Sequence, residues 1–211
     1  MREMLEALKE SFWFFISRIS VSINGSLGSI FLGMRYSPES VEMGLYSGAT
    51  KLSSAGEQMI PPLGDALYPS MVNKKDYRLF YRIVLRGGIL WFLACALVEV
   101  LATPLCVLIL GGQYASAGGF LRILMVGVFF GYFSFMFGYP ALSPIGKATW
   151  ANAAIMVSAI VNLTACAVLW LAGNITPLTV CVVFSSTNIT TFIVRFGAFM
   201  KFRNLAEQDA E

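Results

Sequence analysis

Six long stretches of predominantly apolar residues dominate this sequence. A helix needs about 20 such residues to cross a hydrocarbon core of about 30 Å, and in lipid it satisfies its own backbone hydrogen bonds. The stretches predict an all-α integral membrane protein, a single domain over residues 1–211 built as a bundle of six transmembrane helices. The predicted spans are 12–34, 44–72, 83–110, 117–145, 149–172 and 176–200, followed by a short tail at 201–211.

The charge content supports a membrane protein. Only 13% of the 211 residues are charged and 57% are hydrophobic, whereas about a quarter of the residues of a soluble domain are charged. If the N-terminus is cytoplasmic, the cytoplasmic segments hold ten basic residues and the opposite joints hold only Arg35. The ten are Arg2, Lys9, Lys74, Lys75, Arg78, Arg82, Arg86, Lys147, Lys201 and Arg203. The positive-inside rule therefore predicts that both termini are cytoplasmic.

Enzymatic chemistry has little support in the sequence. No histidine is present, which removes the commonest general base and metal ligand. The four cysteines lie in apolar stretches without the spacing of metal ligands, so we interpret them as packing residues. No phosphate-binding GxxxxGK[ST] motif is present either. We therefore expect no catalytic residue, no metal, no cofactor and no nucleic acid partner, and a membrane-embedded transferase lacks any supporting motif.

Polar residues inside the second predicted span suggest a hydrated cavity. An ionised side chain at bilayer depth costs about 2.5–3.5 kcal/mol on insertion scales, so it normally faces a bundle interior or water. On one continuous helix, Lys51, Gln58 and Asp65 recur every seven residues and share a face. Pro61 and Pro62 can kink this helix and free backbone carbonyls. The span is expected to form a wall of the cavity.

Other spans carry charge as well. Arg18 opens a polar run in the first span, and Glu99 lies midway along the third. Arginine suits phosphate because its planar guanidinium donates two parallel hydrogen bonds, and Lys51 can add a second positive charge. Two interpretations stay open. Arg18 and Lys51 bind an anionic substrate in a cationic cavity, or they pair with acidic residues to hold the bundle together. The candidates for cavity lining or ion coupling are Glu57, Gln58, Asp65 and Glu99.

Three segments of the chain resemble the second half of polysaccharide flippases, the Wzx-type O-antigen transporters of the multidrug/oligosaccharidyl-lipid/polysaccharide exporter superfamily. They are FFISRISVSINGSLGSIFLG at 14–33, VEMGLYSGATKLSSAGEQMIPPLGDALYPSM at 41–71 and GGQYASAGGFLRILMVG at 111–127. The most specific parts are G-x-Y-S-x-A-x-K-L from Gly44 to Leu52 and P-x-x-x-A-L-Y-P-x-M from Pro62 to Met71.

The resemblance implies a transporter of the bacterial cytoplasmic membrane that turns undecaprenyl-diphosphate-linked sugar repeat units toward the periplasm. Arg18 and Lys51 match basic residues of the family's cationic cavity. Family members have two similar halves, so the chain resembles a carboxy-terminal half that works with an amino-terminal half or a second copy of itself, among membrane lipids. Half of a drug or cation antiporter, and a non-transporting subunit or remnant, are the alternative functions.

Overall fold

The computed structural model describes the backbone of residues 2–208 and the side chains of residues 15–203, except those of Ser17 and Lys74. Every regular element in residues 2–208 is a helix, which confirms the all-α prediction. The elements are α1 (Arg2–Gly33), α2 (Val41–Glu57), α3 (Pro61–Lys74), α4 (Tyr77–Val100), α5 (Ala102–Leu110), the 3₁₀ turn η1 (Gly112–Tyr114), α6 (Ala117–Met136), α7 (Tyr139–Leu142), α8 (Ala148–Leu171) and α9 (Pro177–Gln208).

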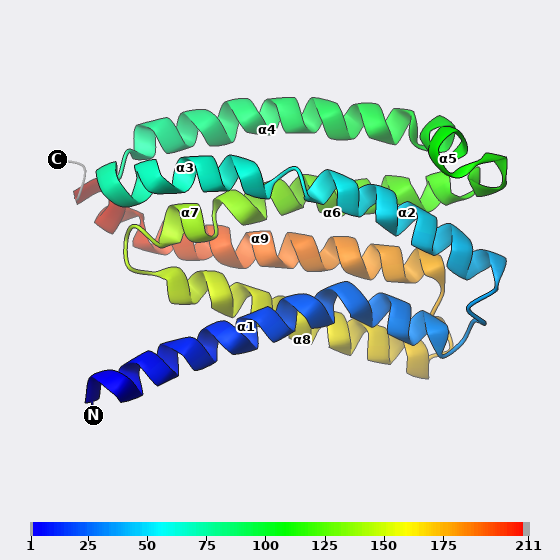
Figure 1. Ribbon diagram of the computed structural model, residues 1–211, viewed down its shortest axis with the longest axis horizontal. Coiled ribbons are helices and arrows are strands. Elements are labelled where there is room, and N and C mark those ends of the chain that lie inside the picture. The colour runs from blue at the N-terminus through cyan, green and yellow to red at the C-terminus, as the bar shows by residue number, and fades with distance from the viewer. Residues whose placement is uncertain (1, 209–211) are drawn as a thin grey trace.

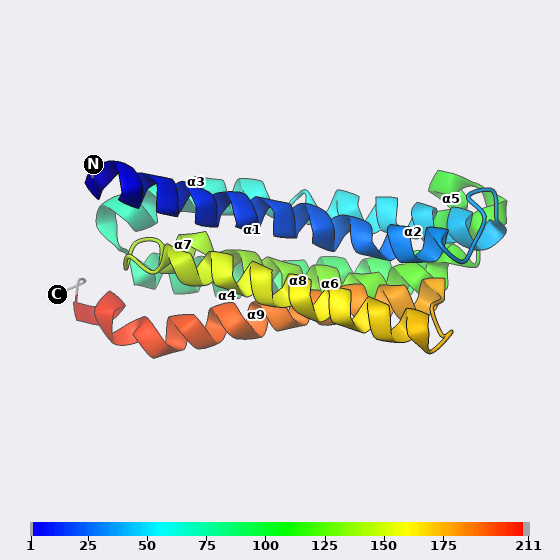
Figure 2. The same ribbon diagram turned by 90° about the horizontal axis from the view of Figure 1, so that it is seen from below.

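The long helices run side by side along one axis (Figure 1). Seen from below, α1 lies with α2 and α3 along one side of the bundle, and the C-terminal half of α9 lies along the opposite side (Figure 2). Helix α6 occupies the centre and packs against α2, α4, α5 and α9. A side chain of α6 also binds α4: the Tyr132 hydroxyl donates a hydrogen bond to the carbonyl of Ile83 at 3.2 Å.

Three of the predicted spans are each two helices rather than one. The span 44–72 divides into α2 and α3, 83–110 into α4 and α5, and 117–145 into α6 and α7. In each case the first helix ends four residues before a proline. The three pairs are Glu57 with Pro61, Val100 with Pro104, and Met136 with Pro140. A proline has no N–H to donate to the carbonyl four residues earlier, and its ring clashes with that carbonyl.

The face predicted for Lys51, Gln58 and Asp65 therefore does not lie on one continuous helix. Lys51 belongs to α2 and Asp65 to α3, and the break between these helices includes Gln58. The predicted tail also differs, because α9 continues as a helix to Gln208 rather than ending near residue 200.

Within the described residues, four helical segments are long and apolar enough to cross a membrane. They are Tyr77–Val100, Ala117–Leu142, Ala148–Leu171 and Pro177–Arg203. They correspond to the last four predicted spans. The first two spans, 12–34 and 44–72, and hence the total of six, stay predictions.

The two ends of the bundle contain different segments of the chain. The first turn of α1, the turn between α3 and α4 and the last turn of α9 lie at the same end, whereas α5 lies at the other (Figure 1). The segments predicted to be cytoplasmic, including both ends of the described chain, thus share one end of the molecule.

Candidate functional site

Helix α1 exposes a row of polar side chains that begins at Arg18. Ser22, Ser26 and Ser29 follow it at intervals of three or four residues, and all four side chains are exposed. Residues spaced in this way lie above one another on a helix. The Ser22 hydroxyl donates to the carbonyl of Arg18 at 3.3 Å, so it is partly satisfied within its own helix.

A second exposed polar row follows α2 and α3. Ser47 and Lys51 lie on α2, Gln58 lies in the break and Asp65 lies on α3. Although the break interrupts the helix, all four side chains remain exposed. We call the two rows together the polar face; its members are Arg18, Ser22, Ser26, Ser29, Ser47, Lys51, Gln58 and Asp65.

The helices that carry the polar face approach each other near one end only. At Gly28 on α1, an added Cβ would lie 2.5 Å from Cγ1 of Val180 on α9 and 2.7 Å from the hydroxyl of Tyr46 on α2. Glycine permits this close approach because it has no side chain. From this region α1 and α3 diverge toward the end of the bundle that contains the chain termini (Figure 1).

The exposed surfaces of α4 and α8 have a different character. Leu85, Leu93 and Leu97 of α4 are 67%, 57% and 60% exposed, and α8 exposes Ile160 and Leu171. Such side chains suit a lipid environment. The polar face does not, because lipid supplies no partner to polar groups. It suits water or another polar protein surface.

Glu57 is the acidic candidate that the structure connects most firmly. It is the last residue of α2, and its Oε1 accepts a hydrogen bond from Nδ2 of Asn188 on α9 at 3.3 Å. Glu57 is partly buried, unlike Gln58 and Asp65. The contact fixes the end of α2 against α9 directly before the break.

The pairing of Lys51 with an acidic residue is not observed. Within residues 15–203, the side chains of Lys51 and Asp65 form neither a hydrogen bond nor an ion pair. Lys51 is exposed on the polar face, where a charged ligand or water can reach it. The interpretation of Lys51 as an ion-pair partner therefore has no contact to support it among the described side chains.

Glu99 lies apart from the other candidates. It is the next-to-last residue of α4 rather than the midpoint of a span, because α4 ends at Val100. It lines a small hollow of about 180 Å³ together with Phe92 and Met125. This hollow lies between α4 and α6, and the polar face lies on α1, α2 and α3. The structure does not bring Glu99 together with Lys51.

Sequence reasoning missed a buried amide network that attaches α1 to α8. Nδ2 of Asn162 donates to Oδ1 of Asn24 at 3.0 Å, and Nδ2 of Asn24 donates to the hydroxyl of Ser158 at 3.1 Å. Cys166 completes the network by donating its S–H to Oδ1 of Asn162 at 3.5 Å. Asparagines inside two predicted spans were the signal that could have suggested this contact.

Sequence reasoning also missed Arg195, a buried residue in the middle of α9. Its Nη1 donates to the carbonyl of Ser134 at 2.8 Å, and its Nη2 donates to the carbonyl of Ala151 at 3.2 Å. The Ser134 carbonyl lies in the last turn of α6, where carbonyls lack helical partners. A cation is favoured at that end of a helix. Arg195 therefore caps α6 and joins it to α8.

The described residues contain no group of three or more Asp, Glu or Cys side chains close enough to hold a metal ion. The four cysteines are buried and unpaired by disulfides.

These features define a multi-pass α-helical membrane protein with a polar face on its first three helices. Residues 1–75 match the sequence model of a family described as polysaccharide biosynthesis protein. The match ends at the residue that follows α3, so it covers the whole polar face. It supports a coarse relation to membrane proteins of polysaccharide biosynthesis. Comparison with curated proteins and with solved structures gives no match.

Proposed function

We propose that this protein transports a lipid-linked oligosaccharide, carried on undecaprenyl diphosphate, across the bacterial cytoplasmic membrane. In this proposal the polar face lines one wall of the transport path, both termini are cytoplasmic and no residue is catalytic. The chain acts together with a second helical bundle, either an amino-terminal half or another copy of itself.

The observation that carries the proposal is the position of two cations on the polar face. Arg18 and Lys51 are both exposed, on helices that diverge toward one end of the bundle. A diphosphate carries two or more negative charges. Arginine binds its oxygens with two parallel hydrogen bonds, and lysine adds a positive point charge. Serine hydroxyls along the same row of α1 can donate to sugar oxygens.

The family match supports the same part of the chain. It covers residues 1–75, which include all of α1, α2 and α3 and therefore Arg18, Lys51 and the acidic candidates Glu57 and Asp65. A relation to polysaccharide biosynthesis restricted to this segment favours a substrate that contains sugars.

The need for a second bundle follows from the surface. A polar face exposed directly to hydrocarbon would leave polar groups without partners. A facing bundle with a water-filled space between the two satisfies them, as in transporters built from two repeats. Glu57, at the junction of α2 and α3, is in this proposal an ion-coupling residue.

The test is to replace each cation and measure two quantities in cells that also supply the second bundle. The variants are Arg18→Ala, Arg18→Lys and Lys51→Ala, and Arg122→Ala on α6, away from the polar face, is the matched control. Surface polysaccharide is measured alongside the amount of protein in the membrane. We expect less polysaccharide at unchanged protein level for Arg18→Ala and Lys51→Ala only, with a partial loss for Arg18→Lys because lysine lacks the guanidinium plane.

Normal polysaccharide display by both alanine variants, at normal protein level, would contradict the proposal. Loss of protein from the membrane in Arg18→Ala would instead assign a structural role to that arginine.

A further inference from the structure

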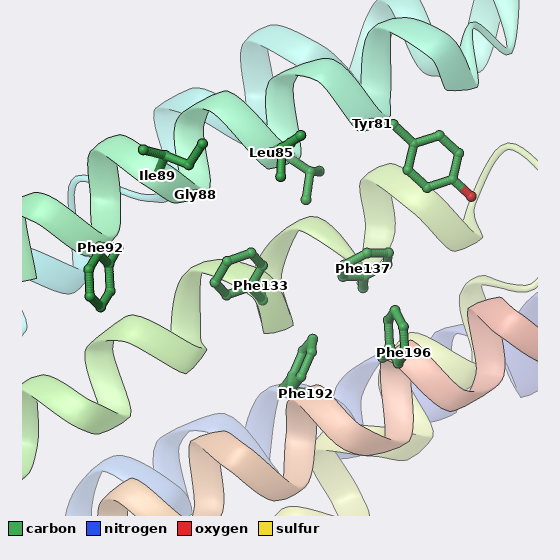
Figure 3. Close-up of a pocket in the computed structure, with 10 residues that line it drawn as sticks. Tyr81, Leu85, Gly88, Ile89, Phe92, Phe133, Phe137, Phe192 and Phe196 are labelled. Atoms are coloured by element: carbon green, nitrogen blue, oxygen red, sulfur yellow. The ribbon is translucent and has the colours of Figure 1, made fainter.

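A wholly aromatic and aliphatic groove lies on the surface between α4 and α9, with α6 as its floor (Figure 3). Its volume is about 540 Å³. Phe133 of α6 and Phe137, the residue that follows α6, lie opposite Phe192 and Phe196 of α9 (Figure 3). The Tyr81 hydroxyl is the one side-chain polar group among the residues that line it.

Gly88 keeps the groove open at its centre. An added Cβ at this position would lie 2.9 Å from Cζ of Phe133, so any larger residue would fill the space or displace the ring. On either side of Gly88, Leu85 and Ile89 of α4 form the rim and are 67% and 55% exposed. An apolar surface groove of this kind favours an apolar ligand, because the ligand and the groove then remove apolar surface from water.

The length of the groove corresponds to one leaflet of a bilayer. Along α4 it runs from Tyr81 to Phe92, which at 1.5 Å per residue is about 16 Å. One leaflet contributes about half of the hydrocarbon core of about 30 Å. A phospholipid acyl chain has this reach. A polyprenyl chain that extends beyond one leaflet would not be contained.

Arginines lie on both helices that wall the groove, near its Tyr81 end. Arg78 and Arg82 lie on α4, seven residues before Leu85 and Ile89 and thus on the same face of the helix. Arg203 lies on α9, seven residues after Phe196. All three side chains are exposed. The acidic residue nearest to Arg78 and Arg82 in the sequence, Asp76, caps α4 by accepting from the N–H of Leu79 at 2.9 Å.

We propose that this groove is a binding site for an anionic phospholipid of the bilayer. One acyl chain lies between α4 and α9, and the phosphate binds to Arg78 and Arg82. The length of the groove selects an acyl chain that stays within one leaflet. The arginines select a negatively charged headgroup through charge-assisted hydrogen bonds. None of the residues that line the groove belongs to α1, α2 or α3, so the site is separate from the polar face and independent of the proposed transport function.

The experiment is native mass spectrometry of the full chain purified in detergent, titrated separately with phosphatidylglycerol and phosphatidylethanolamine. The native protein is expected to retain one phosphatidylglycerol more tightly than phosphatidylethanolamine, which has no net charge. Arg78→Gln combined with Arg82→Gln is expected to weaken that binding about tenfold or more, because hydrogen bonds to charged groups are lost. Ile89→Trp fills the groove and is expected to reduce the binding of phosphatidylglycerol to a similar extent.

Two controls isolate the site. Arg122→Gln removes an exposed arginine from α6, and Leu93→Trp enlarges an exposed α4 residue that does not line the groove. Both should bind phosphatidylglycerol as the native protein does. Equal affinity for the two lipids, or unchanged binding of phosphatidylglycerol by the arginine double variant, would each overturn the proposal. The double variant changes exposed residues only, so it decides the matter even where Ile89→Trp fails to fold.

Discussion

Asn188 of α9 donates a hydrogen bond to the carboxylate of Glu57, the last residue of α2, over 3.3 Å. Directly after Glu57 the chain leaves the helix, and it enters α3 at Pro61. The contact thus ties the break in the polar face to the helix that lies beneath it. Of the acidic candidates predicted from the sequence, Glu57 is the one whose carboxylate accepts a hydrogen bond from a side chain of another helix, whereas Glu99 accepts from Nε of Arg122 through its backbone carbonyl.

Replacing Glu57 should separate a structural role from a role of its charge. Glu57→Ala leaves the amide of Asn188 without its partner and is expected to lower the stability by about 1–2 kcal/mol. Glu57→Gln keeps an acceptor oxygen and should retain the apparent Tm of the native protein. Thermal unfolding in detergent measures both. If Glu57→Gln keeps its Tm but abolishes surface polysaccharide, the charge itself is required. Equal Tm values for the alanine and glutamine variants would contradict the importance of this hydrogen bond.

The amide network between α1 and α8 gives a second prediction. Asn162→Ala removes the donor to Asn24 and the acceptor for Cys166, and should cost about 1–2 kcal/mol. Thr164→Ala is the matched control, because the Thr164 hydroxyl is exposed and donates only to the carbonyl of Ile160 in its own helix. Limited proteolysis should cut the loop after α1 faster in Asn162→Ala than in Thr164→Ala. The same cleavage rate in both variants would argue against the network as the attachment of α1.

Arg195 is expected to be essential for assembly. Arg195→Ala leaves the carbonyl at the end of α6 without a partner and opens a cavity, so a loss of about 3–5 kcal/mol is expected. Arg195→Met restores most of the volume and should retain more protein than the alanine variant. The measurement is the amount of monodisperse protein recovered from membranes, with Arg203→Ala, an exposed arginine on the same helix, as the reference. Equal recovery of Arg195→Ala and Arg203→Ala would refute this role.

Two adjacent glycines of α6 offer an internal comparison. An added Cβ at Gly118 would lie 2.8 Å from Cα and 2.9 Å from N of Thr103, whereas at Gly119 it would have no neighbour within 4 Å. The backbone of α5 cannot move as cheaply as a side chain, so Gly118→Ala should destabilise the protein by about 1–3 kcal/mol. Gly119→Ala should be neutral or slightly stabilising, because alanine favours a helix. Apparent Tm values in detergent test the order, and a more stable Gly118→Ala variant would contradict the close contact.

Cysteine labelling in intact cells tests the orientation. In a variant that lacks the four native cysteines, Asn73→Cys reports on the end of the bundle that contains the termini, and Ser37→Cys reports on the opposite end (Figure 1). Both native side chains are exposed. We expect a membrane-impermeant thiol reagent to label Ser37→Cys only, because the basic residues surround Asn73. Labelling of Asn73→Cys from outside would reverse the predicted orientation.

The sequence by itself determined the helical class and the places where a helix can break. Apolar stretches of more than 20 residues satisfy their own backbone hydrogen bonds in lipid as helices, and a proline four residues after each of Glu57, Val100 and Met136 removes one of those bonds. Pro69, in contrast, lies within α3, so a proline permits a break without requiring one. The same reasoning treated Pro61 and Pro62 as a kink within one span and thus missed the division into α2 and α3.

Only the tertiary structure decided which polar residues meet. Asn24 and Asn162 are separated by 138 positions, and Glu57 and Asn188 by 131, so no local pattern specifies their contact. In the sequence, Arg195 is a basic residue near the end of a predicted span. Its capping role depends on the tertiary structure, which places the end of α6 beside it. The aromatic groove likewise depends on α4, α6 and α9 lying together. Helix packing depends on the shapes of whole surfaces, and these are set by contacts between residues that are distant in the chain.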